Sequence, residues 1–250
     1  MPKAQKKSSP QQTIQPFFNA EALKFLRGLK RNNDREWFEA RREIYERELK
    51  KPLLALVERI TDAMTEFAPA HVRPAEKSVM RIYRDIRFSA DKSPYKTHVS
   101  AWWTRSGLEK TSGGGYYFHF APTEVLVAAG IYMPQREQLM AIRRQLLERH
   151  EEFRSLLNDK KLRKVMDLDL DAQALSRPPK GFPKDHPGMD LIRQQQWGVV
   201  ARLPVEAALQ SSLPREVITR FRLAAPIVEF LNRPFVHSVE KKKQYIFKLM

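Results

Sequence analysis

The chain has 250 residues and a formal net charge of +16, because 45 lysines and arginines outnumber 29 aspartates and glutamates. Hydrophobic residues make up 42% of it, enough for a core and too many for a wholly disordered chain. The absence of cysteine excludes disulfides, cysteine-ligated zinc, iron–sulfur clusters and thiol catalysis. No run of about 18 apolar residues predicts a membrane span, and no signal peptide is visible, so we expect a cytoplasmic protein.

The first sixteen residues are polar and basic, which predicts a disordered tail over residues 1–16 and a single domain over 17–250. Lys3, Lys6 and Lys7 supply only three of the surplus charges, so most of the surplus belongs to the folded part. A positive field of this size attracts polyanions, and nucleic acid is the commonest of them. A basic protein without a polyanionic partner is the alternative.

The first third of the chain predicts a layer of helices. Asn19 and Asp34 suit the N-caps of two helices, and Pro52 suits the first turn of a third. Apolar residues recur at helical spacing behind each of these starts. We therefore expect the aromatic residues of this layer to belong to the core.

The middle third predicts strands. Residues 81–88, 99–105, 116–121 and 125–133 are short, rich in β-branched and aromatic residues, and separated by turn formers. The connections are too short for helical crossovers, which favours an antiparallel meander. The serine–glycine run at 112–115 predicts a flexible connection and lacks the Lys-Ser/Thr of a phosphate-binding loop.

The last third returns to helices. Pro134 introduces a long helix, residues 167–188 predict loops, and residues 191–203 predict an extended segment. Pro214 suits the start of a last long helix with a kink at Pro226. Helices, then strands, then helices predict an α+β fold with a helical N-terminal layer, a central mostly antiparallel sheet and C-terminal helices.

Residues 81–98 hold the densest cluster of charged side chains. On a strand, Arg84 shares a face with Ile82, Ile86 and Phe88, so its charge needs an acceptor. On the other face, Asp85 is placed to orient Arg87, leaving guanidinium donors for an anion. A turn at Asp91 would bring four further side chains to a shared space: Lys92, Tyr95, Lys96 and His98. The segment predicts an anion pocket, and ion pairs that only brace a loop are the alternative.

Other candidate sites have less support. Strand aromatics (Trp102, Trp103, Tyr116 and Tyr117) suit base stacking, although only one of the two tryptophans can face the core. A zinc site would need ligands from distant segments, such as His98, His119 and His186 with Asp91. A nuclease metal on Asp85 and Asp91 is disfavoured by the neighbouring arginines. We expect no metal and no cofactor.

The spacing R-x-x-R-D-x-R-F-x-x-D-K-x-x-Y over residues 81–95 resembles the signature of a widespread bacterial protein family that also occurs in fungi. The matching residues are Arg81, Arg84, Asp85, Arg87, Phe88, Asp91, Lys92 and Tyr95. Further similar stretches extend the resemblance over roughly residues 17–235. The family is of unknown function, so the resemblance implies only that residues 81–95 are the place to look.

Together these patterns predict a protein that binds a phosphate-bearing ligand, foremost nucleic acid, and no membrane. The expected ligand-binding cations are Arg81, Arg84, Arg87, Lys92 and Lys96, with Asp85 and Asp91 orienting them and Tyr95, His98 and His119 lining the site. One alternative is an enzyme for a small anionic or phosphorylated substrate, with His98 or His119 as general base. The other is a structural protein in which the motif braces the sheet.

Overall fold

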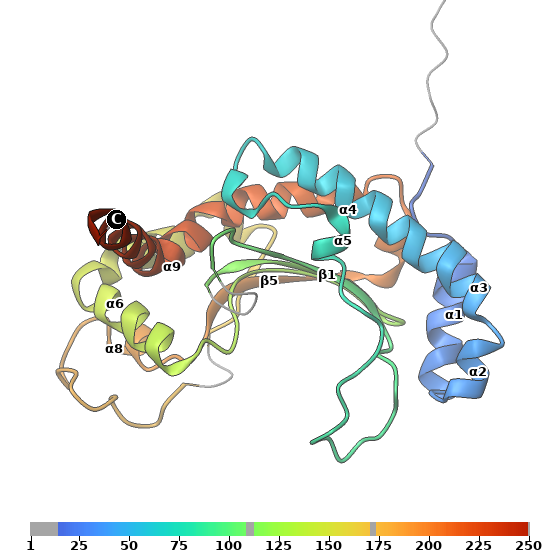
Figure 1. The fold of residues 1–250 in the computed structure, drawn as a ribbon, viewed down its shortest axis with the longest axis horizontal. Helices are drawn as coiled ribbons and strands as arrows, with labels where there is room; N and C mark the ends of the chain where they lie inside the picture. Colours follow the sequence, from blue (N-terminus) through green and yellow to red (C-terminus); the bar gives the residue numbers. More distant parts are fainter. Residues whose placement is uncertain (1–14, 109–112, 171–173, 250) are drawn as a thin grey trace, which may run out of the picture.

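The computed structural model describes residues 15–108, 113–170 and 174–249, with side chains as far as residue 236 (Figure 1). Almost all of the predicted disordered tail lies outside the described residues. The described chain has the predicted α+β architecture: an N-terminal helical layer, a five-stranded antiparallel sheet and C-terminal helices.

The N-terminal helices begin where the sequence predicts. The Asn19 side chain accepts a hydrogen bond from the backbone N–H of Ala22 at 3.0 Å, and Asp34 caps the next helix through Trp37 at 2.8 Å. The helical elements of this layer are α1 (Ala20–Arg31), α2 (Arg35–Glu39), α3 (Arg42–Tyr45), a π-helical turn (Glu46–Lys50), α4 (Lys51–Met64), a 3₁₀ turn (Pro69–His71) and α5 (Ala75–Ser78). Phe25, Phe38 and Tyr45 pack together as core, as expected.

The sheet contains the predicted meander. Its strands are β1 (Val99–Thr104), β2 (Gly115–Phe120), β3 (Glu124–Ile131), β4 (Asp167–Leu168) and β5 (Trp197–Pro204), in the order β1-β2-β3-β5-β4. The prediction of a strand over 81–88 is wrong, because the only ladder contact of this segment is an isolated bridge between Tyr83 and Tyr95. Residues 81–96 instead form an irregular excursion, here called the arm, which hangs beside β1 (Figure 1).

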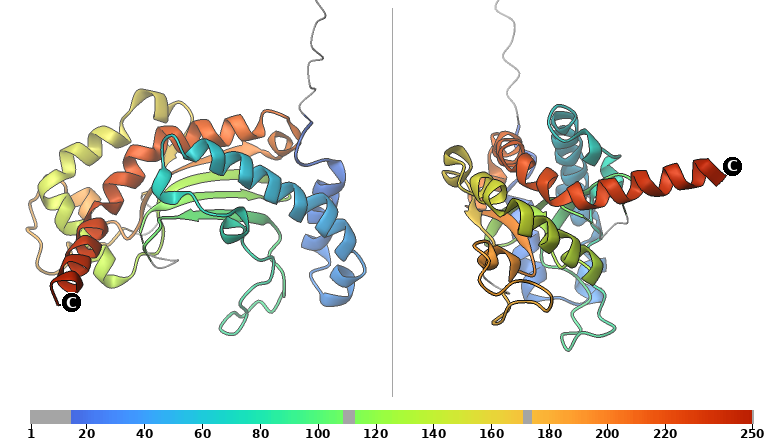
Figure 2. Two further views of the ribbon diagram at one scale, coloured as in Figure 1. Left: turned by 45° about the horizontal axis from the view of Figure 1, so that its top comes forward. Right: turned by 90° about the vertical axis from the view of Figure 1, so that its left-hand side faces the viewer.

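The C-terminal third is helical apart from β4, β5 and loops. Its helical elements are α6 (Arg136–Leu157), α7 (Lys160–Arg163), α8 (Met189–Ile192), a 3₁₀ turn (Val205–Leu209) and α9 (Leu213–Leu249). The extended segment begins later than predicted, at Trp197, since α8 takes up its first residues. Helix α9 runs through Pro226 and Pro234 and carries the C-terminus away from the sheet (Figure 2). None of the described helices combines the length and the apolar character needed to cross a bilayer.

Helices α4 and α9 lie along one face of the sheet and bury it (Figure 1). Trp103 and Tyr116 pack on Phe221 of α9, with ring centroids 5.4 and 5.0 Å apart. Trp103 is fully buried, whereas Trp102 points to the opposite face and is half-buried. This confirms that only one of the two tryptophans faces the core.

The glycine run before β2 is anchored to α9 where it is described. The Gly114 N–H donates to Asn232 Oδ1 at 2.8 Å, and Asn232 Nδ2 donates to the Gly114 carbonyl at 3.1 Å. Gly113 has φ +84°, and a Cβ there would lie 2.6 Å from Asn232 Oδ1. The interpretation as a flexible connection is therefore wrong for Gly113–Gly115, and residue 112 lies outside the described residues.

Candidate functional site

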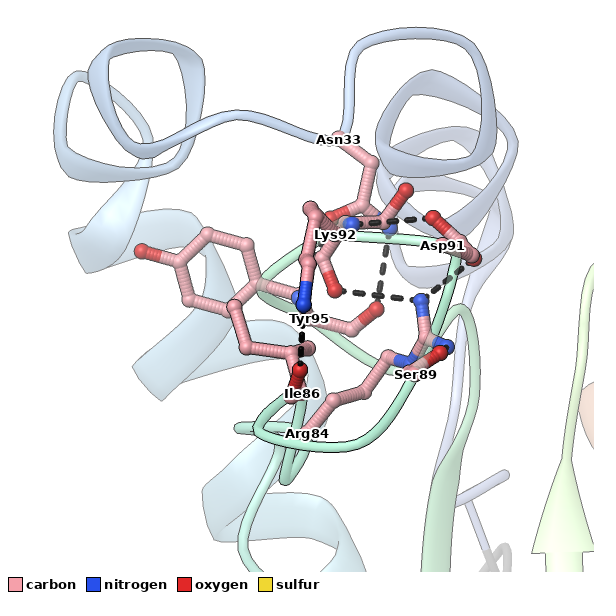
Figure 3. A network of polar contacts seen from close by, with 8 residues as sticks. Asn33, Arg84, Ile86, Ser89, Asp91, Lys92 and Tyr95 are labelled. Carbon is pink, nitrogen blue, oxygen red and sulfur yellow. Dashed lines mark hydrogen bonds and ion pairs between the residues drawn. The ribbon is translucent and has the colours of Figure 1, made fainter.

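The root of the arm is fixed to the helical layer. The Asn33 side chain accepts from the Tyr95 N–H at 3.0 Å and donates to the Tyr95 carbonyl at 2.9 Å (Figure 3). The Tyr95 ring stacks on Phe38, with centroids 4.1 Å apart, and is 2% exposed. Tyr95 is therefore a packing residue, and it does not line the shared space predicted for it.

Arg84 satisfies its charge inside the arm. Its guanidinium forms an ion pair with Asp91 and donates to the Ser93 carbonyl at 3.1 Å and to Ser89 Oγ at 3.4 Å (Figure 3). Asp91 also accepts from the Ser93 N–H at 2.9 Å, as the predicted turn requires. For Arg84 and Asp91, the geometry is that of the bracing alternative.

The tip of the arm carries the remaining motif cations. Arg87 makes a two-pronged contact with Asp85, at 3.0 and 2.7 Å, so Asp85 does orient it. Lys92 Nζ donates to the Ile86 carbonyl at 3.1 Å. Phe88 is 96% exposed, which corrects the prediction that it shares a buried face with Ile82. Hydrogen bonds from Arg87, and from Ser93 and Arg84, lower the pKa values of Asp85 and Asp91 to about 2.

The arm does not gather its side chains into the predicted pocket. Arg81 is exposed, Lys92 turns back to the arm's own backbone, and Tyr95 is buried in the helical layer. His98 lies beyond the arm, one residue before β1, and its ring packs against His119 with centroids 4.8 Å apart. Lys96 lies near enough to His98 for its charge to lower the pKa of that histidine.

A second cluster forms on the sheet face opposite α4 and α9. We call this the open face, since no described helix lies across it (Figure 1). The alternation of β-strand side chains and the strand register place the following residues there: His98, Ser100, Trp102, Tyr117, His119, Glu124, Leu126, Ala128, Val200 and Arg202.

Four rings form a row on the open face. Trp102 and Tyr117 are cross-strand partners with centroids 5.7 Å apart, and Tyr117 meets His119 at 5.6 Å. His98 continues the row beyond His119. Trp102, Tyr117 and both histidines are each half-buried. The row therefore lies beneath no described helix, and its rings are partly exposed to solvent, the His119 side chain to 14%.

His119 lies at the centre of a polar chain. Tyr117 Oη is 3.3 Å from His119 Nδ1, and Glu124 Oε1 is 3.6 Å from His119 Nε2. Arg202 donates to both carboxylate oxygens of Glu124, at 3.1 and 3.0 Å. Burial lowers the pKa of His119, and burial together with the His119 and Lys96 charges lowers that of His98 to about 4. Both imidazoles are therefore neutral near pH 7.

Sequence reasoning singled out His98, His119, Trp102 and Tyr117 but missed Glu124 and Arg202. The sequence signal for Glu124 and Arg202 is the alternation of side chains between the two faces of a strand, which continues through β3 and β5. It could not be used without knowing that β3 pairs with β5, across a sequence separation of 78 residues. In the part of the chain that the structure describes, no three His, Asp or Glu side chains gather as a metal site would require.

Comparison with known proteins identifies the family. The model of a family described as "Conserved hypothetical protein (DUF2461)" matches residues 21–230, which is most of the chain. Among curated proteins, none matches this chain. The matched range includes the arm and every residue of the open face. The chain belongs to the DUF2461 family of conserved hypothetical proteins.

Proposed function

We propose that the open face binds single-stranded nucleic acid, with bases stacking on its rings and phosphates held by cations around it. The observation that carries this proposal is the row of Trp102, Tyr117, His119 and His98 on a sheet face without a covering helix among the described residues. Aromatic side chains on a sheet are a common platform for unpaired bases, each stacking contact contributing roughly 1–3 kcal/mol.

The charges around the open face support the same ligand. Arg202 borders the row and is 63% exposed, and Lys96 lies beside His98. Arg81 and Arg87 stand exposed on the arm, which hangs beside β1 (Figure 1). The net charge of +16 attracts a polyanion from a distance, and the rings then favour unstacked bases over a duplex.

The test is a binding measurement on the whole protein by fluorescence anisotropy. Labelled RNA and DNA strands of roughly 12 nucleotides, and a duplex of the same length, are titrated from low salt to about 0.3 M. Wild-type protein is expected to bind the single strands more tightly than the duplex. Trp102→Ala is expected to weaken single-strand binding about tenfold or more.

Trp102→Phe is the matched control, because it keeps a stacking ring at the same position. It is expected to retain most of the affinity, and Tyr117→Ala is expected to behave like Trp102→Ala. Equal affinity of the wild type and Trp102→Ala, both folded by circular dichroism, contradicts the proposal. So does the absence of binding at low salt.

A second candidate function is acid–base chemistry on a small phosphorylated molecule. The contacts of His119 with Tyr117 and Glu124 favour it, because a neutral imidazole beside a carboxylate is a suitable general base. Incubation with phosphorylated nucleotides and sugars, followed by ³¹P NMR, tests it. Turnover by the wild type that His119→Gln abolishes is the expected result, and no turnover of any compound contradicts it.

A further inference from the structure

A basic cleft lies outside the arm and the open face. It has a volume of about 480 Å³ and is lined by Arg27, Lys30, Arg31, Pro122, Thr123 and Val205. Its walls are the C-terminal half of α1, the β2–β3 turn and the start of the 3₁₀ turn after β5. This volume falls within the roughly 300–1,000 Å³ of ligand sites.

The cations of this cleft have no partners among the residues that the structure describes. In the described part of the chain, none of the three makes an ion pair or a side-chain hydrogen bond, and none of the six lining residues is acidic. The motif cations Arg84 and Arg87, by contrast, are paired with Asp91 and Asp85. Three unneutralised cations and the Thr123 hydroxyl offer donors that suit a phosphate group.

The cleft begins where the open face ends. Thr123 lines the cleft, and the next residue, Glu124, is on the open face beside His119. Near the end of β5, Arg202 lies on the open face, and Val205, the first residue of the 3₁₀ turn that follows β5, lines the cleft. A nucleic-acid strand bound on the rings near Glu124 would therefore have to extend only a short way to contact Arg27 and Arg31.

We infer that this cleft holds backbone phosphates of the same single strand whose bases stack on the open face. The inference rests on the proposed function and adds a second contact region with a defined role. The open face binds bases, whereas the basic cleft beside α1, here called the α1 cleft, binds only phosphates. The α1 cleft therefore lengthens the bound segment without selecting a base sequence.

The experiment compares three variants with the wild type, using single strands of about 4 and about 12 nucleotides over a salt series. Arg27→Glu/Arg31→Glu reverses the cleft charge. Lys160→Glu/Lys161→Glu on α7 makes the same change in net charge elsewhere, and Trp102→Ala removes a ring. All variants are first checked for folding by thermal unfolding.

The cleft variant is expected to bind the long strand about tenfold more weakly than the α7 variant. Its log–log salt slope should be smaller in magnitude by about 1.4, which corresponds to two lost phosphate contacts. Binding of the short strand should depend on Trp102 much more than on the cleft. Replacing the bases at one end of the long strand by abasic sugars should leave the cleft contribution intact.

Other results overturn the inference in distinguishable ways. If Trp102→Ala weakens binding and the cleft variant equals the α7 variant, the cleft role is wrong and the proposed function stands. If neither change alters binding, the proposed function itself fails. If inorganic phosphate raises the unfolding temperature of every protein except the cleft variant, and strand binding by the cleft variant equals that of the α7 variant, the cleft holds a free anion instead.

Discussion

Arg84 shows how a charged motif residue can serve the chain itself. The sequence places it among apolar neighbours and leaves open whether its charge meets a ligand or an internal acceptor. In the structure, Asp91, Ser89 and the Ser93 carbonyl occupy its donors, and three quarters of its side chain is shielded from solvent. In the structure, this residue of the motif therefore stabilises the conformation of the arm.

Arg84→Ala should loosen the arm with little effect on global unfolding, because it removes only local contacts. We expect cleavage by trypsin or chymotrypsin between residues 87 and 92 to become severalfold faster, at nearly unchanged unfolding temperature. Arg222→Ala, which breaks an exposed pair with Glu66, is the control and should leave this cleavage unchanged. Equal cleavage rates in all three proteins would contradict the bracing role.

His98 should make stability depend on pH. Its pKa is about 4 in the folded protein against an ordinary value of 6.5, so the unfolded chain binds more protons below pH 6.5. Stability is therefore complete above that pH and falls as the pH drops towards 4. Between about pH 7 and pH 5 the loss from this group is about 2 kcal/mol.

His98→Gln removes this titration and should flatten the pH profile of unfolding free energy by about that amount. Urea denaturation at a series of pH values measures it. A variant whose profile matches the wild type would show that His98 has the same pKa in both states.

Residue-scale prediction from sequence was uneven for a physical reason. The caps at Asn19 and Asp34 and the Asx turn at Asp91 are local, so neighbouring residues suffice to predict them. Alternation likewise predicts that only one of Trp102 and Trp103 faces the core, but not which one. The partner of Tyr95 is Asn33, 62 residues earlier, and nothing in the local pattern indicates it.

At the scale of elements, the β1–β2 connection depends on a residue of the last helix. Asn232 is fully buried and satisfies both backbone groups of Gly114, and Gly113 leaves room for its side chain. An unpaired buried backbone group costs about 1–3 kcal/mol.

Asn232→Ala should therefore lower the free energy of unfolding by about 1–3 kcal/mol, because the Gly114 N–H loses its partner, whereas the Gly114 carbonyl keeps its contact with His71 Nε2 at 3.2 Å. Urea denaturation gives the value. Glu229→Ala on the same helix, which loses only a surface pair with Arg105, should cost less than about 1 kcal/mol. An equal decrease in the free energy of unfolding in the two variants would show that the Asn232–Gly114 hydrogen bonds stabilise the protein no more than a surface ion pair does.

The elements themselves were predicted well where periodicity is strong. The helices at 20–31 and 136–157 and the strands of the meander repeat their apolar spacing over several turns or pleats. The segment 81–88 alternates as a strand does, yet its polar side chains find partners within the arm, and no neighbouring strand pairs with it. Alternation alone does not create a ladder.

At the scale of the whole molecule, the sequence predicts the net charge directly, but it does not show where on the folded surface the unpaired cations lie. The net charge of +16 is evident from composition, but the arm pairs part of its cations internally. The unneutralised cations of the α1 cleft come from a helix that sequence analysis assigned only to the core layer. Their juxtaposition with the β2–β3 turn exists only in the folded chain.

The tail should contribute little to binding, because it carries only Lys3, Lys6 and Lys7 of the surplus charge. A variant that begins at residue 15 is expected to bind single strands within about threefold of the wild type at moderate salt. Its salt slope should also be nearly unchanged. A loss of an order of magnitude would place the main polyanion contact on the tail, away from the open face.

The reach of α9 also orders the events of folding. Phe221 covers Trp103 and Tyr116, and Asn232 bonds to Gly114, 118 residues earlier in the chain. During synthesis the strands of the meander emerge long before α9, so the apolar face of the meander stays exposed until α9 has been made. Contacts of such long range close slowly, and this interval is when the nascent sheet is most exposed to aggregation and most dependent on chaperones.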